Sequence, residues 1–346
     1  MDHQAFAERY LPLVNASLQA LIRQEGQARD RFYGMMQYHL GWVDEGLTPV
    51  SANPGKRLRP LLCLLACYAS GGDPADALPA AAALELVHSF SLVHDDIEDG
   101  SRLRRGRPAV WDVWGEAQAI NVGDGLFALA HLAILRLSGG SVPAERTLAA
   151  ARALDDACLA LCEGQYLDMR FEGQAEVGVE QYLEMIGLKT AALLAASARI
   201  GVLVATEDAG TAAALHGFGE SLGLAFQIQD DVLGIWGEED VTGKSSSTDL
   251  RDKKKTLPIL HALAHDAGGA GSQRLSSLLQ KVGLLDDEEC REALAILERA
   301  QSRQHAEEMA GHYLRLALGR LGEAGLPPAG VEPLAGLATS LLRRRS

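Results

Sequence analysis

ELVHSFSLVHDDIED, residues Glu85–Asp99, has the pattern of a buried helix that ends in a group of acids. At 3.6 residues per turn, one apolar stripe comprises Leu86, Phe90, Val93 and Ile97. The polar side chains on roughly the opposite side are Glu85, His88, Asp95, Asp96 and Asp99. The stretch therefore predicts a helix over about residues 76–99 with its carboxylates at the carboxyl end.

The same three- and four-residue spacing of apolar side chains continues along most of the chain, and the alternation typical of strands never persists. This spacing predicts an all-α protein that forms one helical domain over residues 1–346. Clusters of Gly and Pro, such as TPVSANPG and LSGGSVP, mark the breaks. The expected helices occupy residues 3–24, 27–45, 56–70, 76–99, 115–138, 144–171, 178–204, 208–235, 256–265, 273–283, 286–321 and 330–344.

Composition limits the possible functions. The net charge of −14 over 346 residues argues against nucleic-acid binding, because that function requires a basic face. No stretch approaches about 18 uncharged apolar residues, so we expect no transmembrane segment. The first residues lack a basic segment followed by an apolar run, so no secretory signal is expected. These features together predict a cytoplasmic protein.

The acids at the end of the first stretch have the spacing of a cation site. Asp95 and Asp99 are four residues apart, and Asp96 and Asp99 are three apart, so their carboxylates can converge on a helix. Magnesium is held by one or two protein carboxylates, with water and substrate phosphate completing its shell. A solvated acidic helix end would produce the same pattern, because runs of charge usually face water.

A second stretch, LAFQIQDDVLGIWG, repeats the arrangement. Asp230 and Asp231 lie late in an apolar helix, Gln227 precedes them by one turn, and a polar stretch with several lysines follows over residues 237–255. Arginines likewise follow the first acidic group. Two carboxylate clusters with nearby cations could enclose a di- or polyphosphate through bridging metal ions. A third basic element, PGKRLRP, begins its own helix, where backbone N–H groups also attract anions.

Several motifs, in this order along nearly the whole chain, resemble those of the trans-isoprenyl diphosphate synthases, or polyprenyl synthetases. GKRLRP resembles the homoallylic-site motif of that family, and ELVHSFSLVHDDIED with LRRGRP resembles its first aspartate-rich motif. NVGD, EGQYLD and LKTA are similar to the intervening signatures. FQIQDDVLGIWG and the residues through KKKTLP are similar to the second aspartate-rich motif.

The resemblance implies a helical bundle of the isoprenoid synthase type with a central apolar cavity. It implies magnesium-dependent, head-to-tail prenyl transfer, in which isopentenyl diphosphate condenses with dimethylallyl, geranyl or farnesyl diphosphate. It further implies three Mg²⁺ ions per active site, with Mn²⁺ as a possible substitute, and a homodimer.

Residue roles follow from the resemblance position by position. The implied metal ligands are Asp95, Asp96, Asp99, Asp230 and Asp231. The residues implied to hold the allylic diphosphate are Arg104, Lys189, Gln227, Lys244 and Lys254, and Thr190 is implied to bind substrate. The residues implied to bind isopentenyl diphosphate are Lys56, Arg59, His88 and Arg105.

Two positions bear on product and metal geometry. Phe90 lies five residues before Asp95. The resemblance implies that an aromatic residue at this position closes the bottom of the product cavity and stops chain growth. The alternative is that Phe90 is an ordinary core residue. We therefore expect geranylgeranyl diphosphate as the product, with farnesyl diphosphate as the alternative. Gly234 stands where many members have a third Asp in the second motif, a departure that concerns the geometry of one metal.

Three other functions share part of this pattern. A class I terpene cyclase also ionises an allylic diphosphate, but it has no second diphosphate to occupy Lys56, Arg59, His88 and Arg105. A di-iron bundle uses Glu-x-x-His, as in Glu85–His88, yet it needs that motif on two helices and no second copy is present. A non-catalytic partner subunit would be free to lose its carboxylates, and both Asp pairs are present here.

Overall fold

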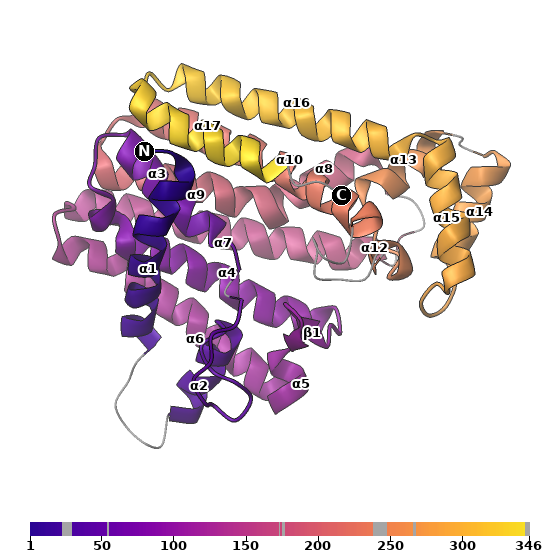
Figure 1. The fold of residues 1–346 in the computed structure, drawn as a ribbon, viewed down its shortest axis with the longest axis horizontal. Coiled ribbons are helices and arrows are strands. Elements are labelled where there is room, and N and C mark those ends of the chain that lie inside the picture. The colour runs from indigo at the N-terminus through magenta and orange to yellow at the C-terminus, as the bar shows by residue number, and fades with distance from the viewer. Residues whose placement is uncertain are drawn as a thin grey trace. The chain divides into compact units, whose positions relative to one another are not determined.

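The computed structural model describes residues 1–22, 30–53, 55–172, 174, 177–237, 248–265 and 268–342. This described part is predominantly helical (Figure 1), which confirms the all-α prediction. The chain divides into two compact units. The first comprises Met1–Cys158, Leu193–His216 and Leu321–Gly336, and the second comprises Leu159–Ala192, Gly217–Arg320 and Leu337–Ser346. The single domain over residues 1–346 stays a prediction.

The first unit is built around α4, which packs along α6 and α3. Four consecutive alanines of α4, residues 80–83, are fully buried, and their small side chains let neighbouring helices approach closely. The helices in the first part of this unit are α1 (His3–Ile22), α2 (Asp30–His39), α3 (Leu58–Ala69), η1 (Pro74–Ala77), α4 (Leu78–Glu98), α5 (Val110–Trp114), α6 (Glu116–Leu135) and η2 (Arg136–Gly139).

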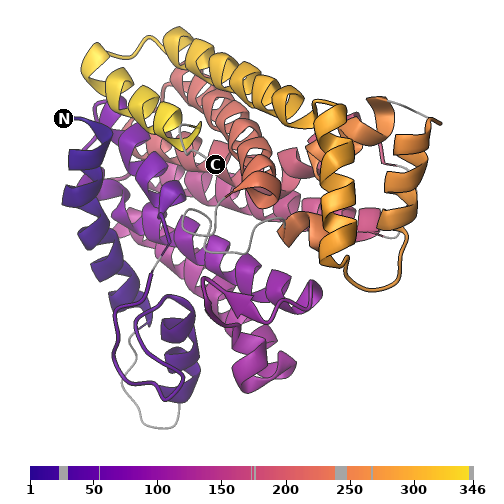
Figure 2. The ribbon, with the colours of Figure 1, turned by 45° about the vertical axis from the view of Figure 1, so that its right-hand side comes forward.

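The remaining helices include several that contribute residues to both units. They are α7 (Ala144–Glu172), α8 (Val179–Ile186), the π-helix η3 (Gly187–Ala191), α9 (Ala192–Ala205), α10 (Ala209–Trp236), α12 (Thr248–Arg251), α13 (Leu257–His265), α14 (Ala270–Leu279), α15 (Asp287–Arg299), α16 (Ser302–Glu323) and α17 (Pro328–Leu342). In the second unit, α13, α14 and α15 lie side by side (Figure 2) around a core that includes Ile259, Leu275 and Leu297.

Two stretches differ from the sequence prediction. A short hairpin of β1 (Leu103–Arg104) and β2 (Arg107–Pro108), followed by α5, occupies a stretch in which no element was expected. The helix predicted over residues 286–321 is broken at Gln301, whose φ of 54° is left-handed. No Gly or Pro marks this break. A tertiary contact lies just after it, where His261 Nδ1 lies 3.0 Å from the hydroxyl of the fully buried Ser302.

Three helical stretches are long and apolar enough to cross a membrane, judged by length and composition only. They are Pro74–Glu98, Glu116–Gly139 and Val179–Ala205, with mean hydropathies of 1.2, 1.4 and 1.6. These windows can each contain up to two charged residues, so they differ from the uncharged run considered in the sequence, and the absence of a transmembrane segment stays a prediction. In the first and third stretches 67% of the most apolar window is buried inside the protein, but in the second only 39% is. Burial within the described residues thus accounts for only part of the apolar character of α6.

Candidate active site

The carboxyl end of α4 carries two aspartates held by one arginine. Arg104 Nε donates a hydrogen bond to Asp96 Oδ1 at 2.8 Å, and Arg104 Nη2 lies 3.4 Å from Asp95 Oδ2. Asp96 is 1% exposed; burial raises the pKa of its carboxyl, an effect that the hydrogen bond and charge of Arg104 oppose. Hydrogen bonds between charged partners are the stronger kind. Asp96 is therefore not part of a solvated acidic helix end.

The β1–β2 hairpin returns Arg104 to these acids. Leu103 pairs with Pro108 and Arg104 with Arg107, so the turn consists of Arg105 and Gly106 alone. Their φ angles are 54° and 74°, and two central residues with positive φ are typical of a type I′ turn. The hairpin thereby folds the chain back onto the end of the helix that precedes it.

The donor set at this helix end fits a divalent cation. Asp96 Oδ2 is buried and accepts no hydrogen bond from the residues that the structure describes, and carboxylate oxygens are the ligands that magnesium prefers. The sequence predicted three converging carboxylates, but the described residues contain no group of three or more His, Cys, Asp or Glu that could hold a metal. Neighbouring carboxylates repel one another unless a positive charge lies between them. In this structure the guanidinium of Arg104 pairs with both Asp95 and Asp96. Magnesium needs few protein ligands when phosphate completes its shell, so these residues remain suited to it.

A buried ion pair lies on the amino-terminal side of the same helix. Arg57, 4% exposed, pairs with Glu85, 2% exposed. Arg57 immediately precedes α3 with a left-handed φ of 48°, which turns the chain into that helix. Because the Glu85 carboxylate binds Arg57, it is not directed at a metal shared with His88, as a di-iron site would require.

The positions expected to bind isopentenyl diphosphate cluster near this pair. Gly55 has a φ of 80°, and a Cβ added there would lie 2.8 Å from Arg105 Nη2, so glycine is what lets the Arg105 side chain approach. Burial lowers the pKa of His88 well below 6.5, and the charges of Arg59 and Arg105 lower it further. Lys56 is exposed on the segment that leads into α3. Cationic and neutral donors therefore gather at the start of α3.

The second acidic pair, in the other unit, has a different environment. Both oxygens of Asp231 accept hydrogen bonds: Oδ2 from Tyr182 Oη at 2.5 Å and from the Leu257 amide at 3.2 Å, and Oδ1 from Gln227 Nε2 at 3.1 Å. Burial raises the pKa of Asp231 to about 7, although the bonds from Tyr182 and Gln227 oppose the shift. Asp230 is half-buried. The structure thus makes Asp231 an anchored carboxylate, with Asp230 the more open member of the pair.

The π-helix η3 presents a lysine and a threonine beside this network. Lys189 Nζ lies 2.5 Å from Asp168 Oδ2 on α7, and Thr190 Oγ1 donates to Gln227 Oε1 at 2.8 Å. A Cβ at Gly164 of α7 would lie 2.2 Å from the Lys189 amide nitrogen. The glycine therefore permits direct backbone contact between α7 and η3.

Sequence reasoning gave no role to Tyr182 or Asp168. Asp168 ends the EGQYLD motif that was identified, and Tyr182 lies seven residues before Lys189, two turns of helix. The motif that ends in Asp168 and the spacing of Tyr182 from Lys189 are both visible in the sequence. Which side chains meet across α7, α8 and α10, however, depends on how the helices pack.

Known proteins resemble this chain in sequence over most of its length. The family model of polyprenyl synthetases matches residues 41–297. The chain belongs to the polyprenyl synthetase family. It is 38% identical to a (2E,6E)-farnesyl diphosphate synthase of Mycobacterium tuberculosis, over 100% of this chain and 96% of that protein. It is 41% identical to a geranylgeranyl diphosphate synthase of the same organism, over 87% and 84% of the two chains.

Solved structures carry the same fold. A polyprenyl synthetase from Streptomyces coelicolor is 38% identical and matches with a TM-score of 0.91, over 99% of this chain and 100% of that one. A geranylgeranyl pyrophosphate synthase from Corynebacterium glutamicum, 25% identical with a TM-score of 0.85 over the whole of both chains, was solved with isoprenyl diphosphate and magnesium. The chain is thus a short-chain trans-polyprenyl diphosphate synthase, a prenyltransferase.

The departure from the family pattern at Gly234 has a structural counterpart in this polyprenyl synthetase. A Cβ at Gly234 would lie 1.9 Å from Asp249 Oδ2, so the Asp249 carboxylate occupies the space into which a side chain at position 234 would extend. The charge of Asp249 also raises the pKa of Asp231. A carboxylate therefore lies beside the second motif although its third Asp is absent.

Phe90 is buried, at 8% exposure, on α4. Its ring centroid lies 5.1 Å from that of Phe127 on α6 and 5.8 Å from that of His94, both edge-on. Such edge-to-face aromatic pairs hold rings in a defined orientation. Phe90 is therefore a fixed bulky group between α4 and α6.

The lysines of the second motif lie in and after the polar stretch that follows α10. Lys244 lies outside the described residues. Lys254 follows α12, and its backbone amide donates to the carbonyl of Asp249 at 2.9 Å. The neighbouring Lys255 donates from Nζ to the backbone carbonyls of Phe171 and Gln174.

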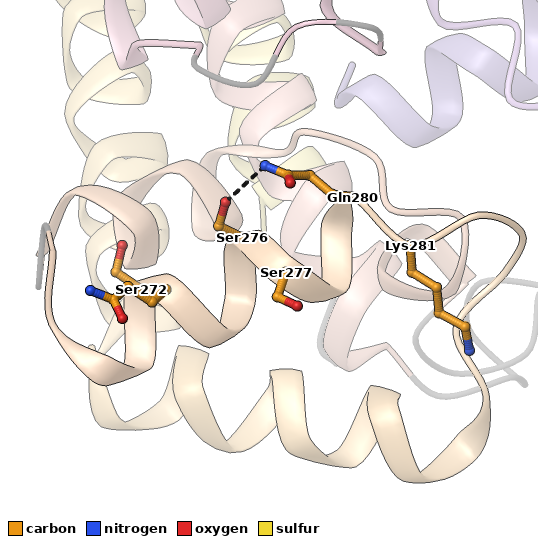
Figure 3. Close-up of a pocket in the computed structure, with 6 residues that line it drawn as sticks. Ser272, Ser276, Ser277, Gln280 and Lys281 are labelled. Carbon is orange, nitrogen blue, oxygen red and sulfur yellow. Dashed lines mark hydrogen bonds between the residues drawn. The ribbon is translucent and has the colours of Figure 1, made fainter.

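A shallow cavity of ≈580 Å³ lies elsewhere in the second unit, on α14 and the two residues after it (Figure 3). Its walls are Ser272, Gln273, Ser276, Ser277, Gln280 and Lys281. Gln280 Nε2 donates to Ser276 Oγ at 3.3 Å, and Lys281 pairs with Glu289. None of these residues was predicted to take part in catalysis, and the one charged side chain among them, Lys281, already forms an ion pair.

Proposed function

We propose that this synthase condenses isopentenyl diphosphate with an allylic diphosphate to give geranylgeranyl diphosphate, with farnesyl diphosphate as the alternative product. The observation that carries the proposal is the Asp95–Asp96–Arg104 group, with the cationic cluster around Arg105 and His88 in the same unit. The relatives support the reaction class, and their products include both chain lengths.

The residue types suit this chemistry. Breaking the allylic carbon–oxygen bond leaves a multiply charged anion, so preorganised positive charge must lie where the negative charge develops. Magnesium bound at these carboxylates would supply part of that charge as a Lewis acid. Arg104, Lys189, Gln227, Thr190, Lys244 and Lys254 are proposed to hold the departing diphosphate. The carbocation must be kept from water, and the apolar helices that end in these acids provide such surroundings.

The metal ligands are proposed to be Asp95, Asp96 and Asp99 in the first unit and Asp230 and Asp231 in the second. Three magnesium ions per active site, with manganese as a substitute, remain the expected complement. Lys56, Arg59, His88 and Arg105 are proposed to bind isopentenyl diphosphate. A terpene cyclase would have no use for this second set.

Product length is proposed to depend on Phe90. Purified protein with magnesium, isopentenyl diphosphate and each allylic primer should give geranylgeranyl diphosphate by mass spectrometry. In the same assay Phe90→Ala should shift the products to longer chains, because removing a buried ring opens space next to Phe127. Phe6→Ala, a buried ring on α1, serves as the control and should leave chain length unchanged. An unchanged distribution in Phe90→Ala would mean that another group stops chain growth; a hydrocarbon made from the allylic substrate alone would favour a cyclase.

A cytoplasmic location is proposed from the family, and a homodimer is proposed from the surface of α6. This helix carries large apolar side chains that are 38–58% exposed: Ile120, Phe127, Leu132 and Leu135. Patches of this kind on a protein surface usually mark interaction sites, and a second copy is the occupant that we propose. Sedimentation in detergent-free buffer should give a dimer, and Leu132→Glu should give a monomer because it places a charge in the contact. A wild-type protein that stays monomeric, or that requires detergent, would contradict this assembly.

A further inference from the structure

Tyr182 is a buried residue of α8 that contacts the second acidic pair but is not among the predicted site residues. It is 2% exposed, and its hydroxyl donates to Asp231 Oδ2 at 2.5 Å. Its ring belongs to an apolar core of the second unit that includes Met185, Ile228 and Leu260. A tyrosine hydroxyl buried in such a core needs a partner, because an unsatisfied buried polar group is destabilising. The packed ring therefore fixes the hydroxyl in place, and Asp231 is the partner that it meets.

The fold fully occupies one oxygen of the Asp231 carboxylate. Oδ2 accepts from Tyr182 and also, at 3.2 Å, from the amide of Leu257, the first residue of α13. Each carboxylate oxygen has about two acceptor sites, so these two bonds leave Oδ2 none for a metal ion. Oδ1 accepts a single bond from the described residues, donated by Gln227 Nε2 at 3.1 Å. Asp231 can therefore meet a cation, or a water bound to one, through Oδ1 alone.

The same carboxylate determines which way the Gln227 amide faces. Gln227 Nε2 donates to Asp231 Oδ1, and Gln227 Oε1 accepts from Thr190 Oγ1 at 2.8 Å. Turning the amide over would place its oxygen against the carboxylate oxygen, so the network favours one orientation. The second N–H of Gln227 makes no hydrogen bond within the described part of the chain, and Gln227 is half-buried rather than enclosed. The orientation that Asp231 imposes thus leaves an N–H for a phosphate oxygen.

We propose that Tyr182 is a positioning residue of the second acidic group, whose hydroxyl holds Asp231 so that Oδ1 remains for the metal shell and the Gln227 amide keeps one orientation. The inference rests on the proposed function for the identity of the metal and the diphosphate. Tyr182 itself contacts neither ligand and acts through Asp231. Without the hydroxyl, Oδ2 regains an acceptor site, so the carboxylate can rotate and Gln227 loses its fixed partner.

The expected consequence is confined to one substrate. Binding of the metal and of the allylic diphosphate should weaken together, because Asp231 and Gln227 are proposed to serve them. Isopentenyl diphosphate should be unaffected, since the residues proposed to bind it belong to the first unit.

Tyr182→Phe tests this role because it removes one oxygen and keeps the buried ring. Free manganese is measured by electron paramagnetic resonance while manganese is titrated into the full-length protein at saturating inorganic pyrophosphate. The variant should bind manganese about tenfold more weakly, a loss typical of one hydrogen bond to a charged group. In steady state, KM for the allylic primer should rise about tenfold, while KM for isopentenyl diphosphate stays within about twofold. Tyr313→Phe, whose ring packs against the same core from α16, is the matched control and should match wild type in both assays.

A double-mutant cycle with Asp231→Ala tests the route of the effect. Because Tyr182 acts through the Asp231 carboxylate, Tyr182→Phe should weaken manganese binding by less than about twofold once that carboxylate is absent. Losses that multiply in the double variant would show that the two side chains act independently, and the proposal would fail.

The remaining outcomes separate the proposal from the function on which it rests. Manganese binding and KM values equal to wild type in Tyr182→Phe overturn the role of Tyr182, as does an equal rise of KM for both substrates. Should this variant fail to fold, Tyr182→Met, a flexible side chain that also lacks the hydroxyl, replaces it. Failure of both to fold would assign the hydroxyl to stability and overturn the proposal. A wild-type protein that binds manganese with pyrophosphate but forms no prenyl product contradicts the proposed function and leaves the binding test of Tyr182 intact. A wild-type protein that binds no manganese overturns both.

Discussion

Asp95→Asn is expected to lower the rate of condensation by a factor on the order of 10³ or more, while the helical circular dichroism stays unchanged. The substitution keeps the shape of the side chain but removes the negative charge that faces Arg104 and that would bind magnesium. Removing a single preorganised group that stabilises developing charge often costs 10²–10³ in rate, and a metal ligand acts on the same charge. Turnover by wild type and variant is measured over a range of magnesium concentrations.

Glu98→Gln provides the matched control. Glu98 is an exposed acid on the last turn of α4, three residues after Asp95, and no role in the site is proposed for it. It should retain activity within about twofold, because surface charges of this kind have small effects. If Asp95→Asn retained full turnover, or if excess magnesium were unnecessary for both proteins, the assignment of the first acidic group as a metal site would be wrong.

Helix α4 illustrates what the sequence can predict. The apolar period of Leu86, Phe90 and Val93 gave a helix over 76–99, and the structure has Leu78–Glu98. The pattern is reliable here because the helix is buried along most of its length, so packing and local preference agree. The acids at its end were therefore placed at the right point of the fold from spacing alone.

The hairpin after α4 could not be predicted in the same way. Its turn places Arg105 at a positive φ, although Asn-Gly or Asp-Gly is the usual signal for such turns. The chain adopts this conformation because the returning strand brings Arg104 to Asp96 and Arg105 to Gly55. These are tertiary contacts, and no local pattern in SRLRRGRP encodes them.

The same limit applies to the partners of the predicted site residues. Sequence identified Lys189, Gln227 and Asp231, but the hydrogen bonds that orient them come from Asp168, Thr190 and Tyr182 on other segments. The long helix predicted over 178–204 likewise contains a π-turn at Lys189 that the apolar period does not reveal. The spacing of residues along one helix predicts which face of the helix a side chain lies on. The side chain that it contacts on another helix is known only from the packed structure.

Gly164→Ala is expected to destabilise the protein by about 3 kcal/mol and to lower kcat roughly 10²-fold. The added Cβ would lie 2.2 Å from the amide nitrogen of Lys189 and 2.6 Å from its Cα. These are backbone atoms, which cannot rotate away as a flexible side chain could, so α7 and η3 must separate. Separation moves Lys189 away from Asp168 and displaces Thr190 from Gln227, the two contacts that orient the predicted diphosphate ligands.

Gly187→Ala separates this effect from the general consequences of replacing a helical glycine. Gly187 begins η3, and a Cβ there would meet no atom within 4 Å, so alanine should be neutral or slightly stabilising through its higher helix propensity. Urea denaturation gives the free energy of unfolding for both variants, and steady-state kinetics gives kcat and KM. Because the glycine at 164 exists to admit the backbone of η3, Gly164→Ala should lose activity even where it remains folded. Equal stability and kcat in the two variants would show that α7 and η3 can move apart without disturbing Lys189, and that the EGQYLD glycine serves another purpose.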